Sequence, residues 1–159
     1  MNADLWLCLT IVIAGLWSGL LLTVTTILHP MFASEDDVGF RHDLGRFLPI
    51  ARRSPTNYVL VIGLVVAPAI ALAAMRDEVS GAPFVLTAIG LVFTFIGAMV
   101  ISRFAAEPNY DVILSDETPA GSQRWTTARR RYFTLNWVRG AFVWTALGCF
   151  SAAGYMSWT

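Results

Sequence analysis

Four long stretches of the chain consist almost entirely of apolar and small residues. They cover about residues 5–28, 57–75, 83–102 and 133–156, and the only charged side chain within them is Arg139. A transmembrane α-helix needs about 20 apolar residues to cross the hydrocarbon layer. The pattern therefore predicts an all-α fold: a single integral membrane domain, residues 1–159, built as a bundle of four transmembrane helices.

The overall composition favours the same class. Apolar residues make up 56% of the chain and charged residues 14%, whereas soluble domains carry about 25% charged residues. The lipid bilayer is thus the expected partner. The 11 basic and 11 acidic residues balance, which argues against nucleic-acid binding because such proteins carry a basic excess.

The arginines between the spans predict the orientation in the membrane. The two long connections, 29–56 and 103–132, carry nine of them, whereas the tails and the short turn 76–82 carry one. Basic residues concentrate on the cytoplasmic side of membrane proteins. We therefore expect a multi-pass protein of the cell membrane with both termini outside and both long connections in the cytoplasm.

Local signals refine the helix limits. Ser54 and Pro55 are suited to the start of the second helix, and the last helix is expected to begin near Ser122. Residues 40–50 place Phe40, Leu44, Phe47 and Leu48 at helical spacing, which predicts a short amphipathic helix on the membrane surface. The GxxxG pattern of residues 15–19 indicates close helix packing.

Five side chains at helical spacing form a stripe that enters the fourth span: Trp125, Arg129, Tyr132, Asn136 and Arg139. Polar groups at membrane depth are costly and often functional. The stripe predicts a polar pocket at the cytoplasmic end of the bundle. The alternative is that Arg139 extends its guanidinium to the interface beside a solvated first turn.

A second group of residues arrives at the same end of the bundle. His29 ends the first span with Thr25 one turn before it, and Asn109 follows the third span. A histidine at a helix end is often only a hydrogen-bonded interface residue, so both readings stay open. Two histidines are few for a metal site, and we predict no metal ligands, although a bound metal is left open. Homo-oligomerisation is also left open.

Four features occur in order along the chain: His29-Pro30 after the first span, Pro108-Asn109 after the third, Trp125 sixteen residues after Asn109, and Arg139 at the entry of the last span. Together they resemble the anthrone-oxygenase-like family of small four-helix membrane proteins. The resemblance implies an enzyme of aromatic polyketide biosynthesis that oxidises an anthrone to a quinone. It implies molecular oxygen as co-substrate and no organic cofactor.

The leading hypothesis is therefore a membrane-embedded oxygenase acting on a small, lipophilic polycyclic phenol. His29 would be the base because the ordinary pKa of histidine lies near working pH. Arg139, Asn109 and Asn136 would stabilise the oxyanion. The residues expected to line the substrate slot are Thr25, Trp125, Tyr132 and Trp137, of which Trp137 also points towards lipid. The alternative is a non-enzymatic helical subunit that docks to a larger membrane complex.

Overall fold

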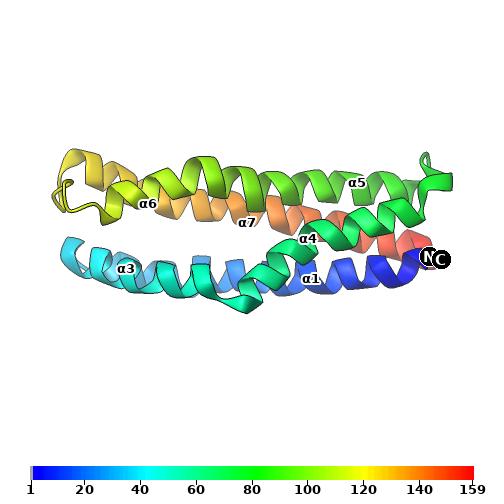
Figure 1. The fold of residues 1–159 in the computed structure, drawn as a ribbon, viewed down its shortest axis with the longest axis horizontal. Helices are drawn as coiled ribbons and strands as arrows, with labels where there is room; N and C mark the ends of the chain where they lie inside the picture. Colours follow the sequence, from blue (N-terminus) through cyan, green and yellow to red (C-terminus); the bar gives the residue numbers. More distant parts are fainter. Residues whose placement is uncertain (1) are drawn as a thin grey trace.

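The computed structural model describes residues 2–159 and is helical almost throughout (Figure 1). Four helices form the bundle: α1 (Ala3–Thr23), α4 (Pro55–Ala74), α5 (Ala82–Thr94) and α7 (Gln123–Trp158). In this ring of four helices α1 packs against α4 and α7, and α5 packs against the same two. Both termini lie at one end of the bundle.

Two of these helices continue well beyond the predicted spans. After α1 the chain runs through η1 (Val24–Leu28) into α2 (His29–Ser34). After α5 it runs through η3 (Phe95–Val100) and η4 (Ser102–Ala106) into α6 (Glu107–Leu114). The extensions α2 and α6 were not predicted from the sequence, which indicated helix in the two long connections only over residues 40–50 and from near Ser122 onwards.

The segments η1, η3 and η4 are π-helical, and a proline follows shortly after two of them. Pro30 follows η1 by two residues and Pro108 follows η4 by two residues. Proline lacks an N–H group and its ring clashes with the carbonyl four residues earlier. A wider π turn accommodates this clash, so the chain passes both prolines without ending the helix.

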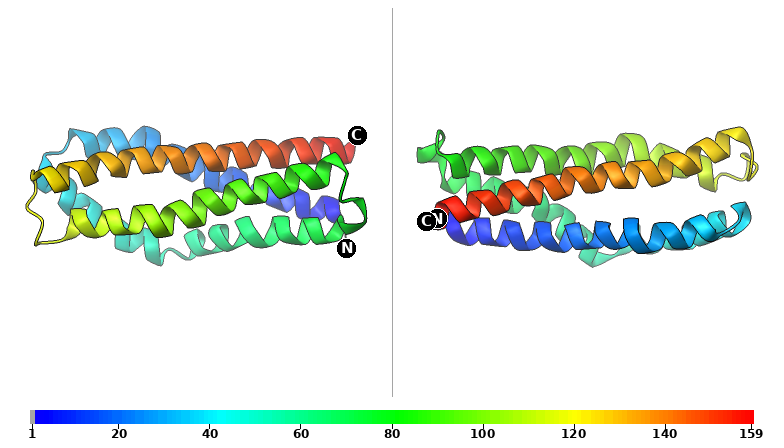
Figure 2. Two further views of the ribbon diagram at one scale, coloured as in Figure 1. Left: turned by 90° about the horizontal axis from the view of Figure 1, so that it is seen from above. Right: turned by 180° about the vertical axis from the view of Figure 1, so that it is seen from behind.

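Three continuous helices are long and apolar enough to cross a membrane. They are Ala3–Ser34, Pro55–Ala74 and Ala82–Leu114, and they contain the first three predicted spans. The fourth predicted span lies in the C-terminal part of α7. Figure 2 shows α7 running along the whole bundle.

Side chains cap the helix starts. The side chain of Asp36 accepts a hydrogen bond from the Gly39 amide at the start of α3 (Asp37–Arg53). Ser54 caps α4 and Ser122 caps α7 in the same way. Both predicted helix starts are confirmed. A short 3-10 turn, η2 (Arg76–Glu78), connects α4 to α5.

The helix α3 differs from the predicted surface helix. It is 17 residues long, and Phe40, Leu44 and Leu48 are buried inside the protein. These side chains belong to a cluster that we call the aromatic core, which also contains residues of α2, α6 and α7. The apolar face of α3 therefore packs on the protein, whereas the sequence predicted that it would lie on the membrane surface.

A second cluster, the span core, fills the half of the bundle nearer the termini. Its members are Ala14, Trp17, Leu21, Leu64, Val143, Ala146 and Phe150. Close helix contacts here occur at Gly90 and Gly97, where an added Cβ would lie 2.5 Å from Phe150 and 2.8 Å from Phe142. Gly15 and Gly19 have no such neighbour within 4 Å, so the prediction from GxxxG is wrong.

Candidate functional site

A cavity of about 480 Å³ lies where the aromatic core meets the span core. Residues of α1, α3, α4, α6 and α7 contribute to its wall, among them Trp17, Leu48, Val61, Tyr110 and Tyr132. Most of the lining is apolar. The polar groups in it are Arg52, Ser54, Thr56, Asn57, Ser102, Glu107, Tyr110, Tyr132, Asn136 and Arg139. We call this cavity the central pocket.

Three charged side chains line this pocket, and Arg139 is the one that has no counter-ion within residues 2–159. Its Nη1 donates a hydrogen bond of 3.3 Å to the Asn136 side-chain oxygen. The buried Nε finds no acceptor within residues 2–159, and no carboxylate of that range forms an ion pair with the guanidinium. An unpaired charge in a sheltered site is costly to keep. The pocket therefore has a positive group that an anionic ligand would neutralise.

The amide of Asn136 fixes the arginine. Asn136 is 4% exposed, and its nitrogen donates to the Tyr132 carbonyl at 3.0 Å. This bond turns the side-chain oxygen towards Arg139, which lies three residues further along the same helical face. The sequence stripe correctly placed Tyr132, Asn136 and Arg139 together.

Two tyrosines bring hydroxyl groups to the pocket. Tyr110 and Tyr132 are both buried, with ring centroids 6.0 Å apart. Tyr132 lies just before the predicted fourth span, and burial raises the pKa of its hydroxyl further above its ordinary value. The hydroxyl therefore stays protonated and can donate a hydrogen bond to a ligand oxygen.

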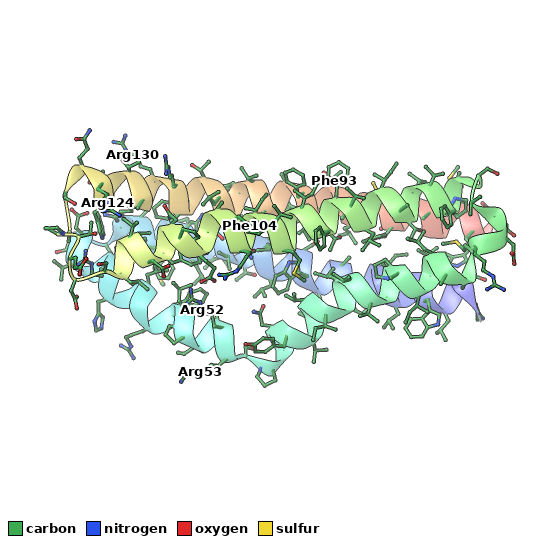
Figure 3. All side chains as sticks on the ribbon, turned by 45° about the horizontal axis from the view of Figure 1, so that its top comes forward. Arg52, Arg53, Phe93, Phe104, Arg124 and Arg130 are labelled. Carbon is green, nitrogen blue, oxygen red and sulfur yellow. The ribbon has the colours of Figure 1, made fainter. Side chains whose placement is uncertain are left out.

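An ion pair between Arg52 and Glu107 lies at the rim of the pocket. The two side chains remain 46% and 34% exposed, and Figure 3 shows Arg52 on the side of α3 that faces α6. Glu107 pairs with Arg52 and forms no ion pair with Arg139.

The π-helical segments surround the pocket. Val24 of η1, Ala98 of η3 and both Ser102 and Ala106 of η4 line it. Single π turns inside α-helices are frequent at functional sites because they re-aim the neighbouring side chains. All three π segments thus contribute residues to the wall of the cavity.

The structure places His29 beside the pocket and not in its wall. The ring is 5% exposed and packs edge-on against Phe133, with centroids 4.9 Å apart. It also contacts Tyr132, at 5.4 Å. Neither ring nitrogen meets a hydrogen-bond partner in the described chain. Tyr132 separates the proposed base from the cavity.

Asn109 and Trp125 also lie away from the central pocket, and both tie helices together. The Asn109 amide donates to the Ala128 carbonyl at 2.9 Å, which joins α6 to α7. The Trp125 indole donates to the Ile113 carbonyl at 3.1 Å within the aromatic core. Their observed contacts are those of structural residues.

The remaining two predicted lining residues point elsewhere. Thr25 is buried, and its hydroxyl donates to the Leu21 carbonyl of its own helix at 2.9 Å. Trp137 is 47% exposed and packs on Trp144. Neither lines the central pocket. Two other residues, Trp17 and Tyr110, line the pocket and were not predicted from the sequence. The one signal that could have found Tyr110 is its position one helical turn after Glu107.

Arg129 is a partly buried arginine whose guanidinium has several partners. It forms an ion pair of 2.7 Å with Asp37 and donates to the Phe32 and Glu35 carbonyls. It also lies 4.6 Å from the Phe40 ring centroid. Arg129 therefore holds α2 and α3 on α7, whereas Arg139 has no comparable set of partners.

No group of three His, Cys, Asp or Glu side chains within residues 2–159 could hold a metal ion. No protein-family model matches the chain, and neither a curated protein nor a solved structure matches it.

Proposed function

We propose that the C-terminal part of α7 is a fourth membrane span. No charged residue follows Arg139 in the chain, and the 36 residues of α7 extend about 54 Å, longer than the roughly 30 Å hydrocarbon layer. The N-terminal part of α7, with α2, α3 and α6, would then project from the membrane. The bias of the arginines supports a cytoplasmic location for this projecting part, with both termini outside.

We further propose that the central pocket binds a lipophilic polycyclic phenol and promotes its oxidation by molecular oxygen. The observation that carries this proposal is Arg139, a cation without a carboxylate partner in a mainly apolar cavity. A flat aromatic molecule would fill the apolar part. Its phenolate or enolate oxygen would lie against the guanidinium and the Tyr132 hydroxyl.

The reaction needs few groups from the protein. An anthrone loses a proton, and its anion transfers one electron to oxygen. The carbon radical and superoxide combine to a peroxide anion, which takes back the proton removed in the first step. The resulting hydroperoxide loses water to leave the new carbonyl group. Overall, one methylene and one O₂ become one C=O and one H₂O. Arg139 would stabilise the anion formed in the first step, more strongly than in water because the site is sheltered.

The proton acceptor is reassigned in this proposal. Glu107 lines the pocket, whereas His29 lies behind Tyr132. A base must come within hydrogen-bond reach of the proton that it removes. We therefore propose Glu107, with Arg52 holding its carboxylate at the rim, and assign His29 to the packing of the aromatic core.

The test is oxygen uptake by the purified protein given an anthrone, measured above the autoxidation of a protein-free blank. We expect uptake by the unmodified chain, a loss of at least tenfold in Arg139→Gln, and a similar loss in Glu107→Gln. Arg76→Gln is the matched control, because Arg76 is an exposed arginine at the opposite end of the bundle.

The absence of uptake above the blank in the unmodified chain would contradict the oxygenase proposal. A non-enzymatic subunit of a larger membrane complex would then be the better account. Uptake that survives in Glu107→Gln and disappears in His29→Gln would return the role of base to His29.

A further inference from the structure

A second concave surface lies between α6 and the N-terminal part of α7, away from the central pocket. Its volume is about 1040 Å³. Three arginines of α7 line it: Arg124, Arg130 and Arg131. Figure 3 shows Arg124 and Arg130 near the end of the bundle opposite the termini, with Phe104 on the neighbouring helix. We call this surface the arginine groove.

The arginine groove carries uncompensated positive charge. No carboxylate is part of its wall. Across residues 2–159, ion pairs form at Arg52, Arg76 and Arg129, and none forms at the three groove arginines. All three are exposed. Arginine presents a planar fork of donors that matches phosphate oxygens.

The groove also has an apolar end. Phe104 is 76% exposed, and Leu135 lies with it in the wall. Leu135 lies nearer to Arg139 than the groove arginines do, since it precedes Arg139 by one turn of α7. In the proposed orientation the apolar end therefore meets the membrane, and Arg130 and Arg131 lie about one turn further into the cytoplasm.

We infer that the arginine groove binds the headgroup of an anionic phospholipid from the cytoplasmic leaflet. The phosphate would lie on Arg130 and Arg131, and the acyl chains would run along Phe104 and Leu135 into the bilayer. Charge complementarity selects this occupant, because basic pockets beside membrane helices on the cytoplasmic side bind anionic headgroups. The inference rests on the proposed orientation and is independent of any oxidation in the central pocket.

The test is native mass spectrometry of the full chain in neutral detergent, titrated with phosphatidylglycerol and with phosphatidylcholine of the same acyl chains. We expect the first phosphatidylglycerol to bind at least tenfold more tightly than phosphatidylcholine. Each arginine near an anionic headgroup contributes about fivefold in affinity. Arg130→Gln/Arg131→Gln should therefore weaken phosphatidylglycerol binding about tenfold or more.

The matched control is Arg46→Gln/Arg53→Gln, which removes the same charge from exposed positions of α3 outside the groove. It should change the affinity less than threefold. Equal losses in the two double variants would overturn the proposal, since they would show a general effect of net charge. Equal binding of the two lipids would also overturn it, as would displacement of phosphatidylglycerol by an equal concentration of inorganic phosphate.

Discussion

Arg139 and Arg129 lie ten residues apart on the same helix, yet their surroundings differ in kind. Arg129 has a carboxylate, two carbonyl oxygens and an aromatic face around it. Arg139 has only neutral partners, the Asn136 amide oxygen and the Tyr110 hydroxyl, beside an open cavity. A fold that needed Arg139 only for stability would do better with an apolar residue, because a sheltered, unpaired charge opposes folding. This contrast is why we assign Arg139 to ligand binding.

Asn109 gives a prediction about stability at the scale of one residue. Asn109→Ala removes the buried hydrogen bond to the Ala128 carbonyl that joins α6 to α7. We expect a loss of about 1–3 kcal/mol in the free energy of unfolding. That corresponds to a fall of roughly 2–4 °C in melting temperature per kcal/mol, measured by circular dichroism in detergent.

The control for this prediction is Asp111→Ala, an exposed position on the same helix. It should stay within about 0.5 kcal/mol of the unmodified chain. Equal melting temperatures for the two variants would show that the Asn109 amide does not fasten the helices.

The sequence predicted part of the site and misassigned the rest for identifiable reasons. Helical spacing correctly put Tyr132, Asn136 and Arg139 on one face, because α7 is regular over that stretch. The same face carries Trp125, but α3 and α6 cover it there, so Trp125 is in the aromatic core. His29 is buried on the same side of its helix as Thr25, but the rings of Tyr132 and Phe133 pack against it. Its position at the end of the first span did not show which side chains would cover it.

At the scale of the elements, the π segment η3, which continues α5, packs closely on α7 beside the central pocket. A Cβ added to Gly97 would lie 2.8 Å from the Phe142 Cβ and 3.4 Å from the Arg139 carbonyl oxygen. Both neighbours are fixed to the backbone of α7, so a rotamer change cannot relieve the contact. Gly97→Ala should push the helices apart, at a cost of about 1–3 kcal/mol in stability.

Gly148→Ala is the matched control for that helix contact. Gly148 lies on α7 with nothing within 4 Å of an added Cβ, so the substitution should be neutral or stabilise by about 0.5–1 kcal/mol. Thermal unfolding of both variants measures the difference. A more stable Gly97→Ala would contradict the described packing of η3 on α7.

The helix starts were predictable because capping is local, whereas the extents of two helices were not. Ser54 and Ser122 are N-cap residues, and a few residues of sequence around each are enough to predict the starts of α4 and α7. The extensions α2 and α6 carry polar residues and prolines, which are typical of connections. They remain helical because the aromatic core buries Phe32, Tyr110 and Ile113 against α3 and α7. Such tertiary support leaves no local signature.

At the scale of the whole molecule, the proposed orientation has a direct test. We expect a membrane-impermeant maleimide to label Asp77→Cys in intact cells, in a chain whose native Cys8 and Cys149 are serine. Asp116→Cys should react only after permeabilisation. Both positions are exposed, and they lie in connections at opposite ends of the bundle. Labelling with the opposite sidedness would invert the proposed orientation.

The central claim is that Arg139 makes the pocket a site for an aromatic anion, and equilibrium binding tests it most directly. Trp17 lines the pocket, so its fluorescence should respond to a hydroxyanthraquinone, which resembles the proposed product and consumes no oxygen. We predict saturable quenching that is lost in Trp17→Phe, with the Kd raised at least tenfold in Arg139→Gln and unchanged in Arg76→Gln. Equal Kd values for Arg139→Gln and Arg76→Gln would contradict the account.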